Sequence, residues 1–465
     1  MLFSSLTFIF IFLPVVCALY FVWNNRLYRN VLLCAASLLF YAWGEPVYIF
    51  LMLFSIALNY ASAIFIDRWK GQPRRKVLFV ITVVLNLLLL GFFKYVPFFI
   101  RNVNFFFHAN LKVPQIALPI GISFYTFQAL SYVIDVYRKK VSAQKNVLHM
   151  ALYISLFPQL IAGPIVRYTD VAKEIGDRSE TFDDFIAGLK MFMVGLGAKV
   201  ILANNMAVVA DSVFADTAKA STLVLWLASL AYTLQIYFDF AGYSRMAIGL
   251  GRMFGFHFPE NFNDPYTADS ITEFWRRWHM TLSSWFRDYV YIPLGGNRCS
   301  AQRHIFNILV TWLLTGFWHG AEWNFMVWGV YYGLLLVAEK YAVMPLRQKL
   351  SASSDNKARA VKIASWIVTL FFVVFGWVLF RTESLNSLAS VISHLFTRSS
   401  ISTATYFAEH ADNMSKLFFM IPAVACCVPA CKKIFSNTYV ALAVFVLSAC
   451  MLIASTYNPF IYFRF

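Results

Sequence analysis

The sequence predicts an all-helical protein that crosses a membrane many times, with roughly ten to twelve transmembrane helices and some re-entrant or interfacial segments. Hydrophobic residues make up 60% of the 465 residues and charged residues only 13%, which is too apolar for a surface that faces water alone. Apolar stretches of about 20 residues, enough to cross the hydrocarbon core, recur along the chain. Because no hydrophilic segment is long enough to fold alone, residues 1–465 are expected to form a single domain.

The expected helices follow the apolar runs in order. Before residue 250 the runs lie near 2–23, 30–43, 46–66, 77–97, 116–137, 147–163, 183–205 and 222–250, and after residue 360 they lie near 361–380, 415–430 and 437–455. No basic residue precedes Arg26, whereas a cleavable signal peptide begins with a positive segment. The first run is therefore predicted to be a permanent helix.

The net charge of +16 could indicate a nucleic-acid partner, but the basic residues lie in short links between apolar runs. In the block 67–76, five of ten residues are Lys or Arg, and a second group follows the run that ends near 338. Such clusters mark cytoplasmic loops under the positive-inside rule. Arg26 and Arg29 mark another inside link, so the N-terminus is expected outside. No nucleic-acid partner is expected.

Residues 270–300 are too charged to span a membrane and too aromatic for an ordinary loop. Arginines at 276, 277, 287 and 298 alternate with tryptophans at 275, 278 and 285. This composition is typical of an interfacial or re-entrant segment.

Two shorter apolar runs follow, at about 305–318 and 323–338. About 14 helical residues cover roughly 21 Å, less than the roughly 30 Å of the hydrocarbon core. Since basic residues flank both outer ends, the pair is predicted to enter from the cytoplasm and turn within the membrane. The turn would place His319, Glu322 and Asn324 at membrane depth, where polar side chains usually mark a functional site.

Two long strings carry a resemblance to a known family: TGFWHGAEWNF from Thr315 and FWRRWHMTLSSWFRDYVYIPLGGNR from Phe274. With QIYFDFAGYSRMAIGLGRMFGFHFPENF from Gln235, FPQLIAGPIVRY from Phe157, the MLFSS start and the NPFIYFRF end, the chain resembles membrane-bound O-acyltransferases of the alginate and peptidoglycan O-acetylation branch. The resemblance implies N-terminal helices in 1–110, a family core with an active-site tunnel in 111–345, and C-terminal helices in 346–465. Arg245 departs from the acidic residue usual in that branch.

The resemblance implies that His319 is the catalytic histidine and His279 a second active-site histidine. A neutral imidazole near pH 7 is also a suitable general base for an acceptor hydroxyl. The alternatives are a buried hydrogen-bonding role for His319 and a headgroup contact for His279. The other histidines, including His257, His304, His394 and His410, are expected at the surface or interface.

Arginine pairs with phosphate in a bidentate way, so Arg276, Arg277 and Arg287 could bind an acyl donor such as coenzyme A, although lipid anchoring explains them almost as well. Trp278 and Trp318 are further candidates for the donor site. The alternative for the tryptophans at 275, 278 and 285 is a position at the membrane–water interface. Glu322 and Asn324 could orient His319 or the acceptor. Asp239, in an apolar helix, could line the tunnel, balance a nearby Arg, or bond helix to helix.

The residues and the resemblance together predict an O-acyltransferase of the bacterial inner membrane. The enzyme would transfer an acyl group from a cytoplasmic thioester such as acetyl-CoA to a hydroxyl group on the outside. In the resembling branch the acyl group is acetyl. No permanently bound cofactor and no metal are expected. The partners would be the lipid bilayer, the donor and a separate SGNH-like periplasmic protein, since no hydrolase domain is present. The alternatives are D-alanyl transfer to teichoic acid, a small-molecule transporter, and a passive scaffold.

Overall fold

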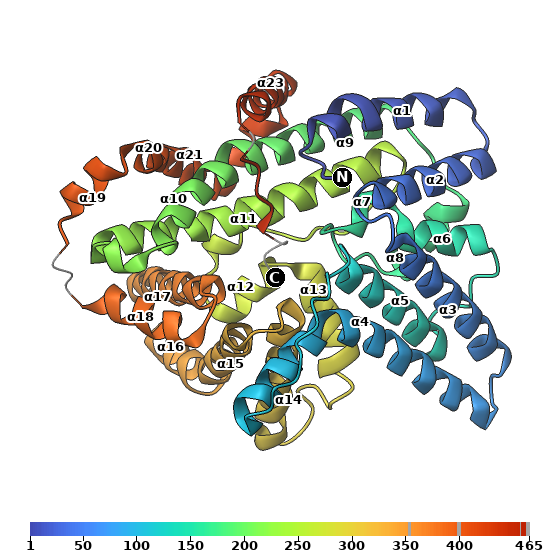
Figure 1. The fold of residues 1–465 in the computed structure, drawn as a ribbon, viewed down its shortest axis with the longest axis horizontal. Helices are drawn as coiled ribbons and strands as arrows, with labels where there is room; N and C mark the ends of the chain where they lie inside the picture. The colour runs from blue at the N-terminus through green and yellow to red at the C-terminus, as the bar shows by residue number, and fades with distance from the viewer. Residues whose placement is uncertain (352–354, 398–400, 456, 462–465) are drawn as a thin grey trace. The chain divides into compact units, whose positions relative to one another are not determined.

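The computed structural model describes residues 1–351, 355–397, 401–455 and 457–461, and over them it is all-helical, without a strand (Figure 1). The predicted all-helical class is therefore confirmed. The last four residues of the NPFIYFRF end lie outside the described residues. The first part of the chain contains η1 (Phe8–Phe12), α1 (Leu13–Val22), α2 (Arg26–Gly44), α3 (Ile49–Arg68), α4 (Pro73–Phe107), α5 (Ile122–Tyr137), α6 (Val147–Ser155), α7 (Phe157–Leu160), α8 (Tyr168–Gly176), α9 (Phe182–Gly197), η2 (Ala198–Ala203), α10 (Asn204–Phe214) and α11 (Thr222–Met253).

The second part carries the short helices of the aromatic segment and the hairpin that follows it. Its elements are α12 (Ile271–Arg277), α13 (Met280–Phe286), η5 (Arg287–Tyr291), α14 (Ala301–His319), α15 (Trp323–Ala338), η6 (Glu339–Val343), α16 (Met344–Ser351), α17 (Asp355–Arg381), α18 (Leu385–Phe396), α19 (Thr403–Glu409), α20 (Ala411–Met414), α21 (Met420–Cys426), α22 (Pro429–Lys432) and α23 (Thr438–Ala454).

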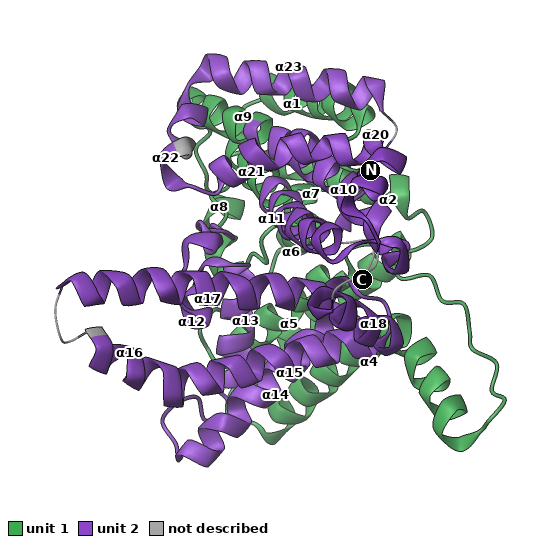
Figure 2. Cartoon of the chain, turned by 90° about the vertical axis from the view of Figure 1, so that its left-hand side faces the viewer, with its two compact units in different colours: residues 1–193, 243–259 green, residues 194–242, 260–465 purple. Residues whose placement is uncertain are grey.

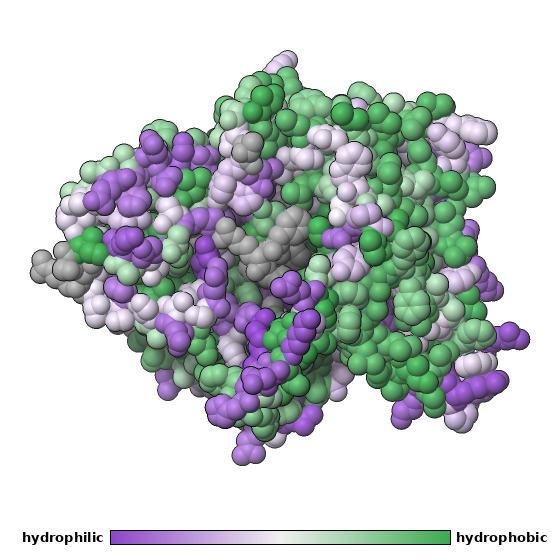
Figure 3. Space-filling model, viewed as in Figure 1, coloured by the Kyte–Doolittle hydropathy of each residue, from purple (hydrophilic) through white to green (hydrophobic). Residues whose placement is uncertain are grey.

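Within the described ranges, five helices are long and apolar enough to cross a membrane: Ile49–Arg68, Pro73–Phe107, Phe182–Phe214, Thr222–Met253 and Asp355–Arg381. Phe8–Val22, Leu385–Phe396 and Thr438–Ala454 are shorter apolar helices. Large apolar side chains of α4, including Val80, Leu88 and Phe92, are exposed, and Figure 3 shows broad hydrophobic areas on one face. Lipid is the solvent that such a surface requires.

Several helix bounds differ from the expected runs, and proline accounts for two of the differences. The expected helix near 415–430 is divided into a 3-10 helix at Ser415–Phe419, α21 and α22. Pro422 and Pro429 have no backbone N–H, so they cannot donate a hydrogen bond to the preceding turn of a helix. The expected run 147–163 ends as a helix at Ser155, just before Pro158. Helix α18 lies where no helix was expected.

The chain forms two compact units, coloured separately in Figure 2. Unit 1 comprises residues 1–193 and 243–259, and within it α5 packs against α3 and α4. Near its surface Glu180 binds Arg26 at 2.6 Å and Arg29 at 2.8 Å. Unit 2 comprises residues 194–242 and 260–465 and contains every predicted site residue. The further subdivision at 110 and 345 stays a prediction.

Candidate active site

Helices α14 and α15 form the predicted hairpin, with Gly320–Glu322 as the turn (Figure 1). The helices approach closely because glycines lie between them: a methyl group at Gly316 would overlap the Phe325 carbonyl, and one at Gly329 would overlap the Trp312 carbonyl. Helix α15 has the bounds that were expected, whereas α14 is longer than expected. Helix α14 includes the polar residues from Ala301 and spans about 28 Å, while α15 continues through η6 into α16.

His319 is the last residue of α14 and lies among aromatic rings. Its ring centroid is 4.9 Å from that of Trp318, 5.2 Å from Trp328 and 5.2 Å from Phe380. Trp318 is buried, and its ring is also 6.4 Å from that of His279. Trp318 therefore packs against both predicted histidines.

His279 lies between α12 and α13 in a left-handed backbone conformation, with φ of 44°. Its Nδ1 is 3.1 Å from the Asn261 side-chain oxygen, which also accepts hydrogen bonds from the Thr281 N–H at 3.2 Å and hydroxyl at 2.8 Å. Because that oxygen only accepts, Nδ1 must carry the proton, and Nε2 keeps its lone pair. Burial lowers the pKa of His279, so its ring is neutral near pH 7.

Nε2 of His279 is buried and has no hydrogen-bond partner among the described residues. A buried imidazole nitrogen with an open lone pair can accept a proton or a hydrogen bond from a substrate. Asn261 thus orients His279 for that role.

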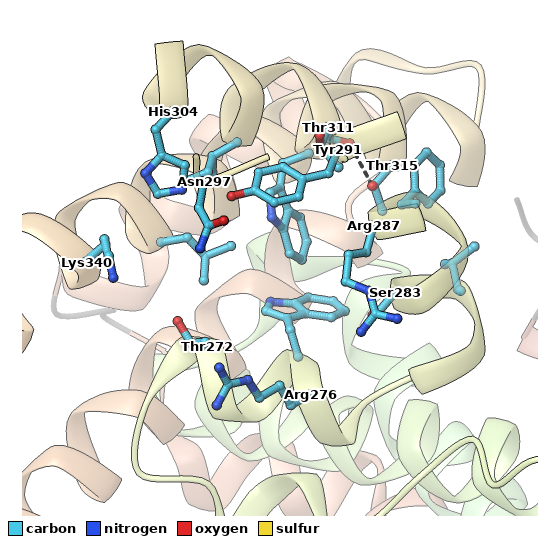
Figure 4. Close-up of a pocket in the computed structure, with 16 residues that line it drawn as sticks. Thr272, Arg276, Ser283, Arg287, Tyr291, Asn297, His304, Thr311, Thr315 and Lys340 are labelled. Carbon is cyan, nitrogen blue, oxygen red and sulfur yellow. Dashed lines mark hydrogen bonds between the residues drawn. The ribbon is translucent and has the colours of Figure 1, made fainter. Parts of the chain in front are cut away.

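A cavity of about 360 Å³ opens between α12, α13, η5, α14 and α15. Its charged lining consists of Arg276, Arg287 and Lys340, and no carboxylate among the described residues lines it. Two carboxylates outside the lining pair with the arginines: Asp288 binds Arg287 at 2.7 Å, and Glu273 lies 3.6 Å from Arg276. Figure 4 shows both guanidinium groups turned toward one side of the cavity and Lys340 at its edge. The positive charge and open mouth suit a phosphate-bearing ligand.

Arg277 and Trp278, which were predicted beside these residues, do not line this cavity. Arg277 pairs with Glu273 at 2.8 Å and donates to the Thr267 hydroxyl at 2.9 Å. Trp278 is buried, with its ring 4.7 Å from that of Trp377. Trp275 and Trp285 are buried as well, so the alternative of interfacial tryptophans facing lipid headgroups was wrong.

A second cavity of about 450 Å³ lies at the other end of α15, where Glu322, Asn324 and Phe325 line it. Its remaining lining includes Phe380 and Arg381 at the end of α17. Thr315 lines the first cavity and Glu322 the second. His319 lies between these two positions along the hairpin.

Asp239 is part of a buried ion pair. Its carboxylate lies 2.8 Å from the Lys199 ammonium and accepts from the Ile461 N–H at 2.7 Å, and both Asp239 and Lys199 are about 1% exposed. Lys199 also donates to Asn204 at 2.9 Å and to the Pro459 carbonyl. The charge that Asp239 balances is a lysine, and the bond joins α11 to η2 and the C-terminal residues.

Sequence reasoning missed Asn261 and the cavity role of His304, which was expected at the surface. His304 is 9% exposed and bonds to the Tyr341 hydroxyl at 2.7 Å. One signal could have found it: residues 304, 308, 311 and 315 recur at helical spacing, and all line the first cavity. No spacing links Asn261 to His279.

Unit 2 therefore has two cavities along the hairpin and a histidine between residues that line them. Residues 37–386 match the profile of MBOAT, the membrane-bound O-acyltransferase family. The chain belongs to this family, so it is a multi-pass membrane O-acyltransferase.

Curated relatives extend the match beyond the family profile. The chain is 44% identical to a probable alginate O-acetylase AlgI of Pseudomonas aeruginosa, over 83% of this chain and 73% of that protein. It is 33% identical to a peptidoglycan O-acetyltransferase of Helicobacter pylori, over 100% of this chain and 98% of that protein. A teichoic acid D-alanyltransferase of Bacillus subtilis is 30% identical over 56% of this chain and 68% of its own length.

Proposed function

We propose that this enzyme moves an acetyl group from a cytoplasmic thioester such as acetyl-CoA to an outside hydroxyl, in the pathway that O-acetylates an envelope polysaccharide. The observation that carries the proposal is the place of His319 on the hairpin, between Thr315, which lines the cationic cavity, and Glu322, which lines the second cavity; His319 itself lines neither. The names of the relatives support acetyl over D-alanyl, because the two acetylating relatives match more of this chain.

The cationic cavity is the donor site in this proposal. Arg276, Arg287 and Lys340 would pair with the phosphates of coenzyme A. Trp312 and Thr315 line the same cavity on α14, and the thioester would lie along them toward His319. Lys340 belongs to the basic group expected in the cytoplasm, which supports donor entry from that side.

His319 acts as the general base. It takes the proton of the acceptor hydroxyl while the hydroxyl oxygen attacks the thioester carbonyl carbon. The tetrahedral intermediate then collapses, the carbon–sulfur bond breaks, and the thiolate takes the proton from His319 as coenzyme A leaves. The Nε2 atom of His279 would accept a hydrogen bond from an N–H or O–H group of the substrate.

Acyl transfer across the membrane needs no flipping of the donor, because the cavities open toward opposite ends of α15. From Asn324 to Lys340 the helix rises by about 24 Å. A bacterial inner membrane, with acetyl-CoA on one side, is the location that fits this arrangement. A separate SGNH-like protein would complete transfer to the sugar.

Deleting the gene in its native host is expected to remove ester-linked acetate from an envelope polysaccharide. Mild alkali would release the acetate for quantification, and a plasmid copy of the gene should restore it. Loss of ester-linked D-alanine instead would select the D-alanyl alternative, and unchanged levels of both esters would contradict the proposal.

Replacing Arg276 and Arg287 together by alanine is expected to raise the KM for acetyl-CoA by about tenfold or more, because each charge-assisted phosphate bond contributes about 1.5–3 kcal/mol. Initial rates of the purified, reconstituted protein would measure it. Arg277→Ala is the matched control: it lies outside the cavity and should leave KM unchanged. An unchanged KM in the double variant would favour the lipid-anchoring alternative.

The basic loops at 67–76 and 347–362 are expected in the cytoplasm. Single cysteines placed at Lys70 and Lys349 should react with a membrane-impermeant maleimide only after the cells are opened. Labelling of either position in intact cells would show that the loop lies outside, which would contradict the predicted orientation and the predicted side of donor entry.

A further inference from the structure

Beside the cationic cavity, unit 2 contains a cluster of buried side-chain donors that have no acceptor among the described residues. The cluster consists of the indole N–H groups of Trp275, Trp328 and Trp377 and the hydroxyl group of Tyr332. These residues are at most 7% exposed, and their rings contact one another. A buried donor without an acceptor is costly, and an indole N–H can only donate. The cluster therefore suits a ligand that carries hydrogen-bond acceptors.

Trp328 contacts both the lining of the cationic cavity and His319. Its ring is 5.5 Å from that of Trp275 and 6.1 Å from that of Trp312, and both of these residues line the cavity. Its ring is also 5.2 Å from that of His319. Trp312 and His319 lie about two turns apart on α14. A thioester that moves along α14 from the cavity to His319 would therefore pass Trp328.

The proposed reaction places a negative charge on the thioester oxygen. When the acceptor oxygen bonds to the carbonyl carbon, an electron pair of the C=O bond moves onto the carbonyl oxygen. When that pair returns, the carbon–sulfur bond breaks and the thiolate takes the proton held by His319. A fixed N–H group near this oxygen, in a site that excludes water, stabilises the tetrahedral intermediate more than the thioester. The base and the oxyanion donor have to reach the same reacting group, as two side chains in contact can.

We propose that the indole N–H of Trp328 donates a hydrogen bond to the thioester carbonyl oxygen and stabilises the oxyanion, which makes Trp328 a catalytic residue beside His319. This inference rests on the proposed function and adds a residue to its site. The pantetheine arm of coenzyme A carries further amide carbonyls, to which the other donors of the cluster would bind. Hydrogen bonds that the free protein lacks would then form when the acyl donor is bound.

The alternative acceptors are the faces of the neighbouring aromatic rings. The ring planes of Trp275 and Trp328 are 84° apart and those of Trp328 and Tyr332 are 71° apart, so an N–H or O–H group could point at a ring face. In that case the N–H of Trp328 would stabilise the fold and take no part in the reaction. The two roles differ in what is lost when the N–H is removed.

Replacing Trp328 by 3-benzothienylalanine removes only the donor, because sulfur takes the place of the N–H in a ring system of nearly the same shape. Transfer from labelled acetyl-CoA to alkali-labile ester is measured in membranes of the deletion strain that carry the variant. The maximal rate is expected to fall about 10²–10³-fold, with a KM for acetyl-CoA within about twofold. The thermal unfolding temperature of the purified variant should be unchanged or higher, since a buried donor without an acceptor is gone. Trp328→Phe should show a similar loss of rate.

Trp226→Phe is the matched control, because the N–H of Trp226 has a protein acceptor. It donates to the Leu395 carbonyl at 3.0 Å, and Trp226 lines neither cavity along the hairpin. This variant should unfold at a lower temperature and keep its transfer rate within about twofold. A benzothienylalanine variant that behaves in the same way would support the ring-face alternative and overturn the inference.

The hydrogen bond can also be measured without turnover. Acetyl-CoA labelled with carbon-13 at the thioester carbonyl is bound to His319→Gln protein, and isotope-edited infrared spectra record the carbonyl stretch. Adding Trp328→Phe should move the band to higher wavenumber, because the C=O bond strengthens when a hydrogen bond to its oxygen is lost. An unmoved band overturns the inference. Failure of the wild-type protein to bind acetyl-CoA or to form the ester would instead contradict the proposed function.

Discussion

Replacing His319 by glutamine is expected to reduce acyl transfer about 10²–10⁴-fold while the protein stays folded in the membrane. The amide keeps much of the volume and some hydrogen bonding of the imidazole, so packing against Trp328 and Phe380 should persist. It cannot take a proton at neutral pH, so the acceptor hydroxyl would attack without a base. The measurement is labelled acetyl transfer by purified protein, with the thermal unfolding temperature recorded in parallel.

Two other histidines are matched controls for that variant. His394 bonds to the Ser390 carbonyl at 3.1 Å and His410 to the Tyr406 carbonyl at 3.1 Å, each within its own stretch of helix and outside both cavities. Glutamine at either position should leave the rate within about twofold. A near wild-type rate of the His319→Gln protein would show that His319 is not the general base.

Replacing Asp239 by alanine is expected to destabilise the protein by about 3–5 kcal/mol, because the Lys199 ammonium would remain buried without its carboxylate. The Ile461 N–H would also lose its acceptor, so the C-terminal residues would be held less firmly. Phe460 stacks on Phe240, whose ring is 6.2 Å from that of His279, so acyl transfer should fall as well. Thermal unfolding in detergent and the transfer rate measure the two effects.

Removing both charges separates the ion pair from other effects of the substitution. The double variant Lys199→Met, Asp239→Ala should recover most of the lost stability, since no uncompensated charge is left. Lys70→Ala, in the exposed pair with Asp67, should cost at most about 1 kcal/mol. An Asp239→Ala protein that unfolds at the wild-type temperature would contradict the structural role of the pair.

The helices predicted from apolar runs include α3, α4 and α11, each of which contains a long apolar stretch. Composition alone determines such spans, because about 20 apolar residues have few alternatives to a membrane helix. The hairpin turn at Gly320–Glu322 could also be predicted, because polar residues separate two apolar runs there. Helix α14 was longer than predicted because polar residues extend it at Ala301, and Pro422 divided an apolar run.

Sequence alone determined that the protein is an all-helical membrane protein. The resemblance carried by the Trp-His-Gly and Phe-Trp-Arg-Arg strings predicted that His319 and His279 belong to one active site. Only the tertiary structure separated Arg276, which lines the cationic cavity, from Arg277, which pairs with Glu273. It also brought Asn261 to His279 and Lys199 to Asp239. The physical reason is that hydropathy and local motifs are properties of neighbouring residues, whereas a cavity lining, a histidine tautomer or a buried ion pair depends on contacts between residues distant in sequence.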